Sequence, residues 1–245
     1  MLIPLPDTDF DPTESAVPWS VLTGAGHRVE FATERGEAPA CDPLLIEGVL
    51  FGKLGAGAEA KRLYAEMREE EGFRSPLAWG DVDPGSYDAL VLPGGHAPGM
   101  RPYLESETLR EKVLALWRSG RPVGAICHGV LVLARTVDPE TGRSVLFDKR
   151  TTALPKYLEA AAWAATAWKL GRYYRTYDTY VEDEVKGALA GRRQFLLGPL
   201  ILEGPDALKD DGRGFAVTDG SYVSARWPGD AYAFARALLA QLEGR

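Results

Sequence analysis

The chain has 245 residues and a formal net charge of −7, from 28 Lys and Arg against 35 Asp and Glu. Acidic charge argues against nucleic-acid binding, which needs a basic patch, and no apolar stretch approaches the length of a membrane span. With only two cysteines and no basic leader segment, we expect a cytoplasmic protein without disulfides.

Short apolar runs predict strands along the whole chain. They lie at residues 1–5, 28–33, 89–92, 123–126, 194–197, 215–218 and 222–225. The last two flank Asp219-Gly220, a strong signal for a hairpin turn.

Amphipathic stretches between these strands predict helices at residues 14–25, 58–70, 106–120 and 230–242. In the third of them Ser106 suits the N-cap, and Leu109, Val113 and Leu116 share one face before Gly120 ends the helix.

Alternation of strands and helices with short turns predicts an α/β fold. We expect a flavodoxin-like, doubly wound domain over residues 1–245, with a mostly parallel sheet covered by helices on both faces. Two stretches rich in Gly, Pro and charge, residues 34–57 and 136–150, are expected as insertions.

The most informative stretch is Pro-Val-Gly-Ala-Ile-Cys-His-Gly at residues 122–129. It predicts a buried strand that stops at Cys127, directly before a new apolar run that begins a helix. A cysteine on such a turn is held above the sheet edge, close to helical N–H groups that favour a thiolate. Taken alone, the pattern is equally typical of a buried structural cysteine, which is how we interpret Cys41.

A second group of residues follows the strand at 89–92, namely Gly94, Gly95 and His96. Ligands of doubly wound sheets bind beyond the carboxyl ends of the strands, where Cys127 and His128 also fall. This convergence favours a functional Cys127.

Histidine is scarce, and no histidine follows His128. This excludes the glutamine amidotransferase triad and the α/β-hydrolase triad, both of which need a later histidine. No zinc-module spacing is present, so we predict no metal and no cofactor, with a site of Cys, His and carboxylate as the minor alternative.

Two motifs carry a family resemblance: Leu-Pro-Gly-Gly-His at 92–96 and Ala-Ile-Cys-His-Gly at 125–129. They resemble the PfpI-like superfamily, which has the class I glutamine amidotransferase-like fold. It includes intracellular proteases, a parkinsonism-associated deglycase and heat-shock chaperones with glyoxalase III activity. Residues 8–36 and the Asp219-Gly220 hairpin also match. The segment 141–159 favours the heat-shock and glyoxalase III branch.

The resemblance implies roles for particular residues. Cys127 would be the nucleophile, and His128 and Glu159 would complete a Cys-His-acid triad in which Glu159 orients the imidazole. Glu14 would reach the thiol from the first helix as a protonated carboxyl.

The glycine-rich turn would line the same site. Backbone N–H groups of Gly95 and His128 are the natural oxyanion-hole candidates, with Gly94 and His96 beside the substrate.

The implied reaction converts a small 2-oxoaldehyde such as methylglyoxal to a 2-hydroxy acid through a Cys127 hemithioacetal, without glutathione. Three alternatives stay open: a hydrolase of peptides or small amides on the same triad, a holdase chaperone or oxidation sensor, and an inactive scaffold. The expected partner is a small molecule, with no nucleic acid and no membrane, and the resemblance also allows a homodimer.

Aromatic residues set this chain apart from familiar members of the superfamily. They are Trp163, Trp168, the tyrosines at 173, 174, 177 and 180, and Trp227 within Arg226-Trp227-Pro228. A tyrosine cluster of this kind is typical of packing or of an interface. If the aromatic residues line the pocket, the substrate is larger than methylglyoxal.

Overall fold

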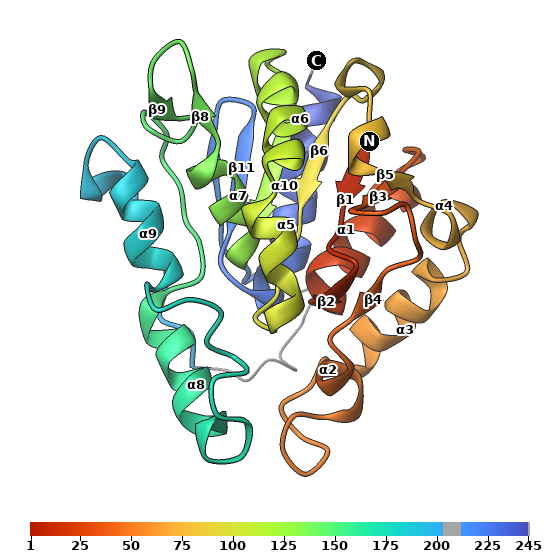
Figure 1. Cartoon of the computed structure of the whole chain (residues 1–245), viewed down its shortest axis with the longest axis vertical. Helices are drawn as coiled ribbons and strands as arrows, with labels where there is room; N and C mark the ends of the chain where they lie inside the picture. Colours follow the sequence, from red (N-terminus) through yellow and green to blue (C-terminus); the bar gives the residue numbers. More distant parts are fainter. Residues whose placement is uncertain (203–211, 245) are drawn as a thin grey trace.

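A seven-stranded sheet lies at the centre of the computed structural model, which describes residues 1–202 and 212–244 (Figure 1). In sheet order the strands are β10 (Ala216–Asp219), β11 (Tyr222–Ala225), β7 (Val123–Ile126), β6 (Leu90–Leu92), β1 (Leu2–Pro4), β3 (Glu30–Thr33) and β5 (Leu77–Ala78). All neighbours pair in parallel except β10 with β11, which form the predicted hairpin. The mostly parallel doubly wound sheet is therefore confirmed.

Helices cover both faces of this sheet, as can be followed in Figure 1. One layer packs α1 (Pro12–Gly24) against α3 (Ala58–Met67) and α10 (Ala231–Glu243). The other layer packs α7 (Val130–Arg135) against α5 (Arg101–Glu105) and α6 (Glu107–Arg118). Because helices protect both faces, the central strands β6 and β7 are buried at every residue, which explains their unbroken apolar runs.

Local signals place these helices as expected. The Ser106 hydroxyl caps α6 by accepting a hydrogen bond from the N–H of Leu109 at 3.0 Å, and Leu109, Val113 and Leu116 are buried on one face. Gly120, with φ of 70°, follows the helix end.

The remaining elements lie outside the main sheet. Residues 34–57 hold β4 (Ala40–Cys41), which pairs with β2 (Thr8–Phe10), and α2 (Pro43–Glu47). Residues 136–150 hold the hairpin of β8 (Val137–Asp138) and β9 (Arg143–Ser144). The helices α4 (Glu71–Arg74), α8 (Lys156–Leu170) and α9 (Val181–Ala188) were not predicted from the sequence, and neither were α2 and α5.

The strand expected at residues 194–197 is wrong. This stretch follows a 3-10 turn, Arg192–Gln194, and forms a single bridge between Phe195 and Thr151. Only Phe195 is buried there, and the apolar run does not add a strand to the edge of the main sheet. Within the described residues, no helix combines the length and the apolar character that crossing a membrane requires.

Candidate active site

Cys127 occupies the turn between β7 and α7. Its φ of 57° lies in the left-handed region, which is strained for a residue with a side chain and persists where the surroundings enforce it. Gly129 makes the turn possible, because a Cβ there would lie 2.1 Å from the carbonyl oxygen of Leu92 on β6. The side chain of Cys127 is completely buried.

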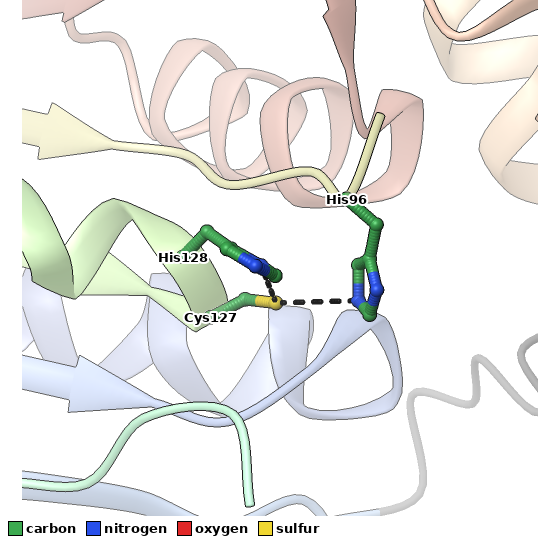
Figure 2. Close-up of side chains that lie close together, drawn as sticks. All are labelled: His96, Cys127 and His128. Carbon is green, nitrogen blue, oxygen red and sulfur yellow. Dashed lines mark hydrogen bonds between the residues drawn. The ribbon is translucent and has the colours of Figure 1, made fainter. Parts of the chain in front are cut away.

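Two imidazole rings face the sulfur, as Figure 2 shows. Sγ of Cys127 lies 3.6 Å from Nδ1 of His128 and 4.0 Å from Nε2 of His96. The two rings meet edge to face, with centroids 4.7 Å apart. The ends of β6 and β7 therefore bring together the two histidines and the cysteine that the sequence places after those strands.

Burial shifts the pKa of each of these three groups towards its uncharged form. It lowers the pKa of His96 to about 4 and the pKa of His128 well below its usual range, so both imidazoles are neutral at neutral pH. Burial raises the pKa of the Cys127 thiol, and the carboxyls of Glu14 and Asp11 raise it further. Removal from water and the nearby carboxyls therefore act against the thiolate that the helix N-terminus favours, and the charge state of Cys127 stays a prediction.

Glu14 reaches the same place from the first turn of α1. Its Oε2 accepts a hydrogen bond from the N–H of Gly94 at 3.0 Å, while its buried Oε1 receives no N–H or O–H donor among the described residues. Burial raises the pKa of Glu14, the charge of Asp11 raises it further, and the Cys127 thiol opposes this shift. A protonated carboxyl next to the thiol follows from this balance.

Gly94 allows these groups to approach one another. A Cβ at this position would lie 2.7 Å from Oε2 of Glu14 and 2.8 Å from the backbone nitrogen of His128. The N–H of His128 interacts with the Cys127 sulfur and lowers the pKa of the thiol. The N–H of His128 would thus be available to donate to an oxyanion formed on the substrate carbon that bonds to sulfur. The N–H of Gly95 as a second oxyanion-hole donor stays a prediction.

Glu159 is buried but does not contact His128. Its Oε1 accepts a hydrogen bond from Nη1 of Arg175 at 2.7 Å, and its Oε2 accepts one from the N–H of Val181 at 3.0 Å. The direct pairing expected for a triad is absent because the nearly buried guanidinium of Arg175 takes the carboxylate. Any role of Glu159 in the site therefore acts through Arg175.

The group facing the far nitrogen of His128 is the hydroxyl of Thr176, with Oγ1 at 3.4 Å from Nε2. This hydroxyl donates its proton to the carbonyl oxygen of His96 at 2.6 Å, so towards His128 it can only accept. This arrangement favours the tautomer with the imidazole proton on Nε2, in which the lone pair of Nδ1 faces the thiol. Sequence reasoning missed Thr176 because it lies in an irregular segment without a motif.

A cavity of about 260 Å³ adjoins His96. Asp11, Tyr174 and Trp227 line it together with apolar residues from α8 and from residues 45–54. Of the aromatic residues singled out in the sequence, Tyr174 and Trp227 line the cavity. The hydroxyls of Tyr173 and Tyr174 both donate to Asp42.

The side chains of His96, Cys127 and His128 form a group that could hold a metal ion. Nε2 of His96, Sγ of Cys127 and Nδ1 of His128 all lie within 4.8 Å of one another. Two nitrogens and a sulfur are ligands that zinc and copper accept.

A protein-family model described as ThiJ/PfpI family-like matches residues 5–199. The chain belongs to this family. The PfpI-like superfamily inferred from the two glycine and cysteine motifs is thereby confirmed.

Relatives cover most of the chain. A deglycase of Pyrococcus abyssi is 26% identical over 238 residues, which are 96% of this chain and 94% of the relative. Glyoxalase 3 of Candida albicans is 24% identical over 232 residues, 94% of this chain and 88% of the relative. The crystal structure of Candida albicans glyoxalase III superimposes with a TM-score of 0.70 at 20% identity, over 98% of this chain and 95% of that one, which supports the fold.

Proposed function

We propose that this protein is a cysteine-dependent enzyme that converts 2-oxoaldehydes to 2-hydroxy acids without glutathione. The observation that carries the proposal is the Cys127 sulfur placed 3.6 Å from Nδ1 of His128, beside the buried carboxyl of Glu14. Nucleophile, base and proton shuttle are the groups this chemistry needs. Relatives named glyoxalase 3 and deglycase support aldehyde chemistry.

The reaction begins at the thiol. Nδ1 of His128 takes the thiol proton while the sulfur bonds to the aldehyde carbon. The former carbonyl oxygen takes up a proton from the His128 imidazolium or from the Glu14 carboxyl, which yields a hemithioacetal and leaves the group that gave the proton able to act as a base. His128 suits the role of base because its neutral Nδ1 faces the thiol, and its lowered pKa makes it return the proton readily.

Proton transfer between the two adjacent carbons follows. Glu14 or His128 takes the proton from the sulfur-bearing carbon and a proton is delivered to its neighbour, through an enediol-like state. The product is a thioester of the 2-hydroxy acid on Cys127. Water then adds to the thioester, the carbon–sulfur bond breaks, and the thiol regains its proton. Overall, one aldehyde and one water give one 2-hydroxy acid.

The burial of Cys127 favours a small substrate over a peptide, because an extended chain needs an exposed nucleophile. A holdase or an oxidation sensor would need no turnover, so activity discriminates between these functions. The test is lactate formed from methylglyoxal without glutathione, with Cys127→Ser as the matched variant. We expect lactate from the native protein and none from a folded Cys127→Ser, whereas absence of lactate from the native protein would overturn the proposal.

A further inference from the structure

The cavity beside His96 has a wall made by one face of α8. Its residues Leu158, Ala161, Ala162, Ala165 and Thr166 follow the spacing that places side chains on one side of a helix. Because three of the five are alanines, the wall has little bulk, and space remains where larger side chains would fill it. This helix face is apolar except for the Thr166 hydroxyl.

The opposite wall comes from other parts of the chain. Leu45 of α2 and the following Val49 and Leu54 form one side, and Trp227 and Pro228 after β11 form another. Phe51 stacks on Trp168 at 6.3 Å between ring centroids, which joins this 45–54 segment to α8. Residues from these three separate segments thus line one apolar space.

Three of the polar groups that line the cavity, those of Asp11, Tyr174 and Thr166, make hydrogen bonds within the chain. The Asp11 carboxylate accepts a hydrogen bond from the N–H of Thr13 at 2.7 Å, and the Tyr174 hydroxyl donates to Asp42 at 2.8 Å. The Thr166 hydroxyl donates to the carbonyl oxygen of Ala162 at 2.8 Å. The cavity therefore favours hydrocarbon over a sugar, an amino acid or a phosphate.

His96 connects this space to the chemistry, because it lines the cavity and lies 4.0 Å from the Cys127 sulfur. A three-carbon aldehyde bound at the sulfur would leave the apolar walls in contact with water. We propose that the cavity is a subsite for the substituent of the substrate, so that the preferred substrates are 2-oxoaldehydes carrying an alkyl chain of several carbons or an aryl ring. The substrate class rests on the function proposed above.

A homologous series of substrates tests this inference. Methylglyoxal, 2-oxohexanal and 2-oxooctanal share the same reacting carbonyls and differ only in chain length. We expect kcat/KM to rise about 10-fold or more from the first to the last, since buried methylenes strengthen binding. Ala162→Phe, which fills the cavity, should abolish the rise, and Ala164→Phe, on the exposed side of the same helix, should retain it. A flat series in the native protein overturns the inference.

A second measurement does not depend on turnover. The Cys127 thiol adds across the double bond of an N-alkylmaleimide, with sulfur on one carbon and a proton on the other. Mass spectrometry should show labelling of Cys127 about 10-fold faster with N-hexylmaleimide than with N-methylmaleimide, and equal rates in Ala162→Phe. If methylglyoxal is turned over but both series are flat, the subsite is wrong and the reaction stands. If labelling depends on chain length but no 2-oxoaldehyde reacts, the subsite stands and the proposed reaction and substrate class are wrong.

Discussion

The Thr176 hydroxyl lies 3.4 Å from Nε2 of His128, at the ring nitrogen that does not face Cys127. Since this hydroxyl donates to the carbonyl oxygen of His96, it favours the tautomer of His128 with the proton on Nε2 and Nδ1 free to act as a base. Arg101 fixes the segment by donating to the backbone oxygen of Thr176 at 2.6 and 3.0 Å.

Replacing Thr176 by Val should therefore impair the base rather than substrate binding. We expect kcat to fall about 10- to 100-fold with KM almost unchanged, because valine has similar volume and no acceptor for Nε2–H. Thr176→Ser keeps the hydroxyl and should restore most of the rate. Steady-state kinetics across pH checks this, and a serine variant as slow as the valine variant would show that the hydroxyl is not the cause.

Glu14→Gln tests the proton shuttle. Glutamine retains an oxygen that can accept from the N–H of Gly94, and it cannot release or take up a proton. We expect kcat to fall on the order of 100-fold. Stability at neutral pH should be retained, since the raised pKa means that the folded site already favours the uncharged carboxyl. Kinetics and urea unfolding measured together check this, and a fully active variant would remove Glu14 from the mechanism.

Asp11 should make the stability of the protein depend on pH. Burial raises the pKa of Asp11 from 3.8 to about 6. The contribution of the protonated Asp11 carboxyl to the unfolding free energy is therefore fully present below about pH 4 and is lost as pH rises through about 6. Asn keeps the oxygen that caps Thr13 and Glu14 without the charge. Between pH 4 and pH 7 we expect the unfolding free energy of Asp11→Asn to fall by about 2 kcal/mol less than that of the native protein. Identical pH dependence of urea unfolding in both would contradict this.

Glu159→Gln tests whether Glu159 acts directly in catalysis or serves to hold Arg175 in place. Arg175 would keep its charge in a nearly buried place without its partner, which costs about 3–5 kcal/mol of stability. Activity should fall with it, because Arg175 adjoins Thr176. Asp183→Asn, which breaks the more exposed pair with Lys156, should leave stability almost unchanged. Lost activity with native stability in Glu159→Gln would instead indicate a direct catalytic role.

The fold was accessible from the sequence because strand and helix periodicities differ and the parallel strands are buried on both faces. The same reasoning placed His96, Cys127 and His128 at one edge, since each directly follows a strand that ends there. α8 lacked such a signal: its run of Ala and Trp has no clear polar face, and most of it lies against the cavity or solvent.

Site chemistry was less accessible, because it depends on burial and on contacts distant in the sequence. Thr176 lies 48 residues beyond His128. The helix N-terminus alone suggests a lowered pKa for Cys127, whereas burial and the Glu14 carboxyl shift this pKa upward.

The central claim is that the substrate becomes covalently bound to Cys127. Rapid acid quenching of the protein during turnover of methylglyoxal, followed by intact and peptide mass spectrometry, tests it most directly. The account predicts a transient mass gain of one methylglyoxal on the peptide that contains Cys127, and neither adduct nor lactate in Cys127→Ser. Lactate formation at the native rate by Cys127→Ser would contradict it.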